Sequence, residues 1–438
     1  MRNKSLLSHF AKYVSLNVIA MLGLSCYILA DTFFVSNGLG TGGLAALNLA
    51  IPVYSFINGA GLMIGIGGAT RYTVNRAQNK DNEANSVFTH SVCFGTVLGI
   101  VFFIAGSFFS DELSILLGSN KATFKMCNTY LKTLMCFAPI FILNDILVAF
   151  VRNDGSPKLS MSAMLIGSIS NIFLDYVFIF PFKMGMFGAA FATGLAPVIS
   201  IIFMSGYFIK GKNNFHLVRE RFCLSNIKTI SSLGISSLIT EVSSGIVIII
   251  FNITILKLAG NLGVAAYGII ANLALVSTAI FTGIAHGIQP IISENYGVRN
   301  YNNIGKALRY ALVTSVAFSV VVYAFSFLLS PQIVSIFNKN NDKVLSELAV
   351  KGIRIYFIGF LFSGCNIVSA SLFSASEKPV QSFVISVLRG FILIVPLLLL
   401  LTFILKMNGV WMSYPLTEFI TLIVAVFFLR QENLNNPF

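Results

Sequence analysis

Two carboxylic acids lie inside long apolar segments of this chain, where ionisable residues are rare. Asp175 lies in segment 159–180, and Asn171 precedes it by four positions, so the amide and the carboxyl share one face of a helix. Asp31 lies in the first apolar segment of the chain. A carboxylate in hydrocarbon costs about 2.5–3.5 kcal/mol on insertion scales, so it normally faces a cavity or a partner. Both acids are therefore candidates for binding a cation or a proton.

The composition predicts a protein that crosses a membrane many times. Hydrophobic residues make up 56% of the 438 positions, the charged fraction is 10%, and the mean hydropathy is +0.84. Soluble globular chains are typically about 25% charged. Segment 1–12 is short and basic and is followed by an apolar segment too long for a signal peptide, so we expect no cleavable signal. The six cysteines lack the paired spacing of metal ligands.

Twelve apolar segments are long enough to be spans. They cover residues 13–36, 45–70, 87–109, 126–150, 159–180, 186–209, 229–256, 264–290, 305–329, 350–375, 379–404 and 409–429. An even number of spans places both termini on one side of the membrane. Most of the 29 Lys and Arg residues then fall on the same side as the termini, and the positive-inside rule makes that side cytoplasmic. This distribution explains much of the net charge of +13 without a nucleic-acid partner.

The chain also repeats itself at a shift of 220 to 222 residues. The segment Gly40–Ala46 resembles Gly260–Ala266, and Met186-Phe-Gly resembles Met407-Asn-Gly. Asn144 and Asn366 each lie thirteen residues before a proline. Six spans separate the copies, so both copies have the same orientation in the membrane. This arrangement predicts two six-helix bundles related by a pseudo-two-fold axis along the membrane normal, as in transporters that move two bundles about a central site.

Once the direction in which each span crosses the membrane is assigned, the position of a residue in its span gives its depth in the membrane. Asp31, Asn171 and Asp175 fall in the outer halves of spans 1 and 5, and Thr193 falls at a comparable depth in span 6. Such a set of oxygen atoms suits a hard cation such as Na⁺, and a buried carboxylate pair suits a proton, because desolvation and repulsion favour its uptake. The alternative is that these acids only bond neighbouring helices or pair with a base. No basic residue lies within spans 1, 5 or 6 away from their ends.

Glu241 in span 7 and Glu418 in span 12 are the acids expected near mid-membrane in the second bundle. Either could bind a cation or touch substrate, or be neutralised by Arg389 or His286. Asp145 lies seven residues before Arg152 and is interpreted as structural.

Several motifs together resemble the multidrug and toxic compound extrusion (MATE) family of secondary transporters, over most of the chain. They are Asp31-Thr-Phe-Phe-Val, Pro52 with the glycines of span 2, Arg152-Asn-Asp-Gly-Ser-Pro, Asn171-Ile-Phe-Leu-Asp-Tyr, Gly185-Met-Phe-Gly-Ala-Ala-Phe-Ala-Thr193, Gln289-Pro290 and Gly409-Val-Trp.

The resemblance implies export of lipophilic, often cationic drugs in exchange for H⁺ or Na⁺. It places the coupling-ion site, and a possible Na⁺, at Asp31, Asn171, Asp175 and Thr193. Further members of the substrate cavity or of a secondary cation site would be Tyr130, Asn144, Glu241, Gln289 and Glu418. One branch of the family also uses an acid in span 10, and segment 354–376 contains none at that depth, which favours the first bundle.

These observations predict an all-α polytopic membrane protein whose bundles cover residues 1–209 and 229–438, joined by a cytoplasmic linker at 210–228. We expect an H⁺- or Na⁺-coupled multidrug antiporter in the cell membrane, monomeric and without a cofactor, that is not an enzyme. A flippase for a lipid-linked sugar, from the same wider superfamily, is the alternative, but it would favour a basic cavity. A membrane-embedded enzyme would need a nucleophile–base pair or metal ligands at membrane depth, and the sequence shows neither.

Overall fold

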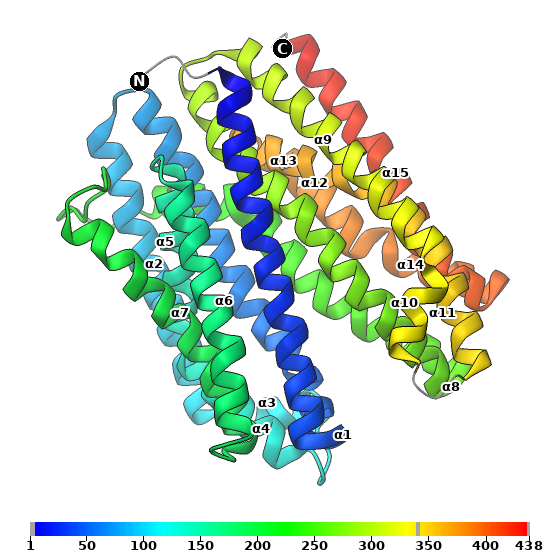
Figure 1. The fold of residues 1–438 in the computed structure, drawn as a ribbon. Helices are drawn as coiled ribbons and strands as arrows, with labels where there is room; N and C mark the ends of the chain where they lie inside the picture. The colour runs from blue at the N-terminus through cyan, green and yellow to red at the C-terminus, as the bar shows by residue number, and fades with distance from the viewer. Residues whose placement is uncertain (1–4, 339–341, 436–438) are drawn as a thin grey trace. The chain divides into compact units, whose positions relative to one another are not determined.

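The computed structural model describes residues 5–338 and 342–435, and within these ranges every regular element is helical. The elements in chain order are α1 (Leu6–Ala77), α2 (Asp81–Phe108), α3 (Ser110–Leu116), α4 (Phe124–Cys136), α5 (Ala138–Asn153), α6 (Pro157–Ile179), α7 (Gly185–Ile209), α8 (Leu224–Gly297), α9 (Tyr301–Leu328), α10 (Ser330–Phe337), α11 (Lys343–Tyr356), η1 (Phe357–Gly359), α12 (Phe360–Ala375), α13 (Pro379–Val387), η2 (Leu388–Ile392), α14 (Ile394–Leu405) and α15 (Met407–Asn435). Figure 1 labels these helices along the ribbon, coloured in chain order. The predicted all-α class is confirmed.

The long helices α1 and α8 each hold two spans. At 1.5 Å per residue, the 72 residues of α1 would reach about 108 Å, more than three times the thickness of a bilayer core. Each helix is interrupted at a glycine with positive φ, Gly40 at 68° and Gly260 at 62°. Nine helices of the described chain are long and apolar enough to span, and α4 with α5 forms one further bent span. With α1 and α8 counted as two spans each, this gives the twelve expected.

One predicted span differs in shape. Segment 126–150 was expected to be one helix, but α4 ends at Cys136 and α5 continues from Ala138 at an angle of 49°. Pro139 is the second residue of α5. Proline has no N–H to donate to the preceding turn, so a continuous helix is disfavoured there.

The internal repeat extends to the backbone conformation of the turns. Positive φ recurs at Asn79 and Arg299 (both 59°), at Gly155 and Glu377 (86° and 55°), and at Gly185 and Lys406 (61° and 52°). Residues other than glycine rarely adopt this conformation. The matched pairs keep the shift of 220 to 222 residues seen in the sequence, so the two halves share their turn geometry as well as their helices.

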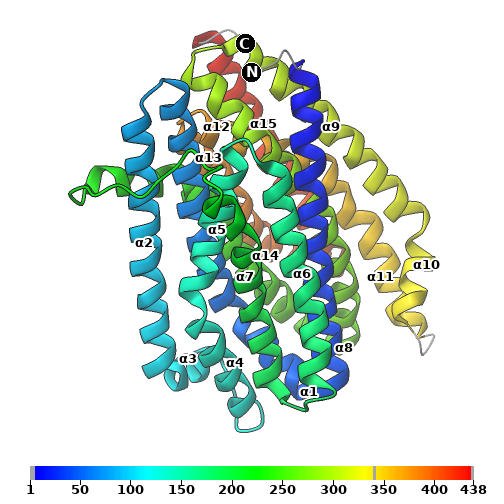
Figure 2. The same cartoon turned by 60° about the vertical axis from the view of Figure 1, so that its left-hand side comes forward.

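The described chain forms two compact units. Unit 1 contains residues 1–18 and 243–438, and unit 2 contains residues 19–242. The bundle boundaries expected from the sequence, 1–209 and 229–438, stay a prediction, and the units are described by their own bounds. In unit 1, α12 packs against α9 and α15. In unit 2, α6 and α7 lie side by side (Figure 2).

The start of α8 belongs to unit 2 because glycines allow it to approach α1 closely. A Cβ atom built on Gly234 would lie 1.8 Å from the carbonyl oxygen of Met63, and one built on Gly67 would lie 2.0 Å from that of Ile230. Small residues at such crossings let transmembrane helices pack backbone against backbone. Glu241, at the end of this stretch, is consequently held in unit 2.

The segment 210–223, between α7 and α8, is attached to unit 2. Phe215 is buried among Tyr72, Phe88, Phe150 and Phe208. Asp154, after α5, accepts hydrogen bonds from the hydroxyls of Tyr72 and Tyr207 and from the backbone and side-chain nitrogens of Asn214. Side chains of α2 bind the same segment, since Asn85, Thr89 and His90 accept hydrogen bonds from the backbone of His216, Val218 and Cys223. Hydrogen bonds and aromatic contacts therefore hold most of this segment against unit 2.

Candidate functional site

Asp31 and Asp175 meet in the interior of unit 2. Asp31 lies on α1 and is 7% exposed, and Asp175 lies on α6 and is fully buried. Their carboxyl groups are within hydrogen-bonding contact of each other. Two carboxylates repel at this range unless a proton or a cation is held with them. The pair is therefore suited to taking up positive charge.

Asn171 and Thr193 complete the first group of residues. With its amide oriented so that nitrogen faces the acid, Asn171 donates to Asp175 Oδ2 at 3.0 Å and accepts from the Thr193 backbone N–H at 3.3 Å. The i, i+4 spacing on α6 produces the first bond, and the packing of α7 against α6 produces the second. The Thr193 hydroxyl donates to the carbonyl of Ala189 at 3.0 Å and is hydrogen-bonded with Tyr130 of α4. Five of the predicted residues thus lie together.

No Lys or Arg of the described chain forms a salt bridge with either acid, and their ionisable neighbours are each other, Tyr27 and Tyr130. One oxygen of each carboxyl, Oδ1 in both, is buried without a hydrogen-bond partner. Buried polar atoms in proteins normally have partners. Two such oxygens beside an amide and a hydroxyl fit a hard cation or a shared proton.

Sequence reasoning missed two tyrosines next to this group. Tyr27 and Tyr54, both on α1, are joined through their hydroxyls at 2.9 Å. Tyr27 precedes Asp31 by four residues, so the helical period could have indicated that it lies on the same face. Tyr54 lies in the returning half of α1, and nothing in the sequence indicates which residue it faces.

Glu241 belongs to a different compact unit from Glu418. It lies in unit 2, where its carboxyl is hydrogen-bonded to Asn58 and interacts electrostatically with Asp145. Asp145, interpreted from the sequence as structural, keeps its Oδ2 buried and without a hydrogen-bond partner. The amide oxygen of the neighbouring Asn144 also has none among the described residues. These three residues lie apart from the hydrogen bonds of the first group.

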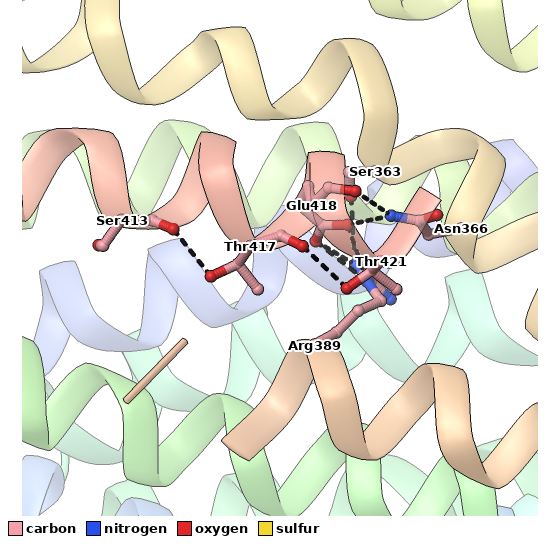
Figure 3. A network of polar contacts seen from close by, with 7 residues as sticks. All are labelled: Ser363, Asn366, Arg389, Ser413, Thr417, Glu418 and Thr421. Carbon is pink, nitrogen blue, oxygen red and sulfur yellow. Dashed lines mark hydrogen bonds and ion pairs between the residues drawn. The ribbon is translucent and has the colours of Figure 1, made fainter. Parts of the chain in front are cut away.

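Both carboxylate oxygens of Glu418 accept hydrogen bonds within unit 1, as Figure 3 shows. Arg389 donates from Nε to both carboxylate oxygens at 3.0 Å and from Nη2 to Oε1 at 2.8 Å. Asn366 donates to Oε2 at 2.7 Å and also to the backbone carbonyl of Glu418 at 2.9 Å. Ser363 accepts from Arg389 Nη2 at 3.2 Å. Arg389 is therefore the counter-ion of Glu418, one of the roles considered for this pair, and a cation or substrate role for Glu418 stays a prediction.

Arg389 is placed by an irregularity in the helix. It lies in η2, a π-helical turn that separates α13 from α14. The corresponding stretch of the first half, in α6, is uninterrupted. Such turns add a residue to the helix and recur at functional positions. Gln289, the remaining predicted residue, is buried in α8 within unit 1.

Comparison with known proteins gives a consistent set of similarities. The MatE family model matches residues 17–177 and 234–400. The multidrug export protein MepA of Staphylococcus saprophyticus is 26% identical over 395 residues, covering 89% of this chain and 86% of that protein. A MepA protein of Staphylococcus aureus is also 26% identical, over 396 residues.

Solved structures share the fold. A MATE transporter in complex with MaL6 superposes with a TM-score of 0.92 at 22% identity, covering 98% of this chain and 96% of that one. An outward-facing multidrug resistance MATE transporter gives a TM-score of 0.91 at 23% identity, with the same coverage.

Proposed function

Because this chain belongs to the MatE family of membrane transporters, we propose that it exports lipophilic, often cationic drugs in exchange for H⁺ or Na⁺. The names of its MepA relatives support multidrug export. The proposed coupling-ion site consists of Asp31, Asn171, Asp175 and Thr193, with Tyr130 beside it. The observation that carries the proposal is the contact between Asp31 and Asp175 in the absence of a salt bridge to either acid within the described chain.

The proposed mechanism is alternating access with the ion and the drug in competition. Binding of H⁺ or Na⁺ from outside reduces the negative charge of the Asp31–Asp175 pair, and the site then releases a cationic drug outward. Asn171 holds Asp175 in position through the bond to Oδ2. A ligand shifts a conformational equilibrium only as far as it binds one state better, so the ion and the drug must prefer different states. The protein would act in the cytoplasmic membrane as a monomer, with both termini in the cytoplasm.

The test is transport by purified protein in liposomes. Asp31→Asn and Asp175→Asn keep size and hydrogen bonding but remove the charge that takes up the ion. We expect each to be inserted and folded normally, as judged by size-exclusion chromatography, and to lose gradient-driven movement of a cationic dye. Asp111→Asn, the same change at an exposed acid of α3, should transport like the wild type. Normal coupled transport by well-folded Asp175→Asn protein would overturn the proposal.

A further inference from the structure

One face of the returning half of α1 carries Tyr54, Asn58 and Gly61, at positions i, i+4 and i+7. Each of these residues meets a different polar partner within unit 2. Tyr54 is hydrogen-bonded to Tyr27 at 2.9 Å, and Asn58 is hydrogen-bonded to Glu241. A Cβ atom on Gly61 would lie 2.4 Å from Asp145 Oδ2, so the glycine leaves room for that carboxylate. We call this row of residues the α1 polar face.

The α1 polar face lies between two pairs of acids. Tyr27 interacts electrostatically with Asp31 and Asp175, the pair described above, and also with Asp145 of the second pair. Tyr54 interacts with Asp145 and Glu241, which also interact with each other. The ionisable groups found facing Tyr54 are thus one phenol and two carboxylic acids. The hydrogen bond between the two tyrosine hydroxyls joins two groups that interact electrostatically with the acids of both pairs.

Only one of the two tyrosine hydroxyls can keep its proton free for an acid, because the other hydroxyl donates its proton to the bond between them. Either oxygen can be the donor in the bond between Tyr27 and Tyr54, and each hydroxyl carries one proton. If Tyr54 donates to Tyr27, the proton of Tyr27 remains available to the side of Asp31 and Asp175. If Tyr27 donates instead, the proton of Tyr54 remains available to the side of Asp145 and Glu241. The bond therefore has two arrangements, and the charge on either acid pair biases the choice.

The hydrogen bonds of Asp145 and Glu241 are not those of a pair that only stabilises the fold. Asp145 Oδ2 is buried and has no hydrogen-bond partner, which costs stability that an apolar side chain would not. Glu241 has the Asn58 amide as its hydrogen-bond partner, and the charge it interacts with at Asp145 is of the same sign. The contrast is with Glu418, whose buried carboxylate is neutralised by Arg389.

We infer that Tyr54 is a positioning residue that couples the Asp145–Glu241 pair to the Asp31–Asp175 pair through its hydrogen bond with Tyr27. Charge uptake at one pair would then change the affinity of the other, and linkage requires the effect to be reciprocal. The inference rests on the proposed function, since it assumes that Asp31 and Asp175 take up the coupling ion. It adds a second acid pair and names the residue that connects the two.

A double-mutant cycle in liposomes tests the coupling. The measured quantity is the pH of half-maximal dye transport in the wild type, Glu241→Gln, Tyr54→Phe and the double mutant. Removing the negative charge of Glu241 should move the midpoint of the wild type to lower pH by about half a unit or more, a shift typical of coupled neighbours. In the Tyr54→Phe background, Glu241→Gln should shift the pH of half-maximal transport by less than half as much.

Two further variants make the result decisive. Tyr27→Phe removes the same hydrogen bond from its other end and should reduce the Glu241→Gln shift equally, so the test survives if Tyr54→Phe fails to fold. Tyr176→Phe, at a tyrosine of unit 2 that is 51% exposed, should leave the shift unchanged. An unchanged shift in well-folded Tyr54→Phe, or no shift from Glu241→Gln in the wild type, would overturn the inference. Absence of ion-driven transport by the wild type would instead overturn the proposed function.

Discussion

The guanidinium of Arg389 lies against the carboxylate of Glu418, with Nε 3.0 Å from both carboxylate oxygens and Nη2 2.8 Å from one of them. Asp31 and Asp175 show the opposite arrangement, because each carboxyl has another carboxyl as its close ionisable neighbour. The pair in unit 1 is neutral overall, whereas the pair in unit 2 is neutral only when it holds added positive charge. This difference supports the proposal that the acids of unit 2, and not Glu418, take up the coupling ion.

The first prediction concerns the stability of the Arg389–Glu418 pair. Their side chains are 14% and 2% exposed, so removal of one partner leaves a buried charge alone. Such changes typically cost about 3–5 kcal/mol. We expect Arg389→Met and Glu418→Met each to lower the midpoint of thermal unfolding in detergent. The double mutant should recover most of the loss, because it buries no charge. A double mutant that is less stable than either single mutant would contradict this account.

A second prediction concerns the orientation of the chain in the membrane. The distribution of basic residues places the loop around Ala122 outside and the segment around Leu217 inside. Both positions are exposed, Leu217 by 66%. In a background without the six native cysteines, a membrane-impermeant maleimide should label Ala122→Cys in intact cells. Leu217→Cys should react only after the cells are opened. Equal labelling of both positions in intact cells would show that the depths assigned to the acids are wrong.

A third prediction tests the close crossing of α1 and α8 in unit 2. Gly234→Ala would place a methyl group 1.8 Å from the carbonyl oxygen of Met63, a backbone atom that cannot move by rotamer change. Overpacking of this kind typically costs about 1–3 kcal/mol. Gly206→Ala is the matched control, since its Cβ atom would meet nothing within 4 Å. Thermal unfolding in detergent should show a loss only for the Gly234 variant, and equal midpoints would refute the proposed contact.

The sequence was sufficient for those features that depend on period and depth. Asn171 and Asp175 are four residues apart on one helix, so their hydrogen bond follows from the helical period. Asp31 and Asp175 were placed together because both lie in the outer halves of spans that run the same way. The repeat was visible because its turns require particular residues, such as Gly40 and Gly260 with positive φ.

Features that depend on how helices are rotated and paired could not be predicted. The bond between Tyr27 and Tyr54 joins residues 27 positions apart, and the sequence does not tell which faces of the two spans meet. Glu241 follows the linker, so the sequence predicts it in the second bundle, and that boundary stays a prediction. Glu241 lies in unit 2 because the glycines of α8 pack against α1. The interaction of Asp145 with Glu241 could not be predicted for the same reason, since one residue precedes the linker and the other follows it.

The bounds of the two units have a consequence for dividing the polypeptide. A cut in segment 210–223 would give an amino-terminal fragment that carries residues 1–18 of unit 1 and a carboxy-terminal fragment that carries the start of α8, which belongs to unit 2. Neither fragment would contain all of either unit. We therefore expect each fragment to need the other to complete its packing, so function from a split gene would require both fragments to be produced in the same cell.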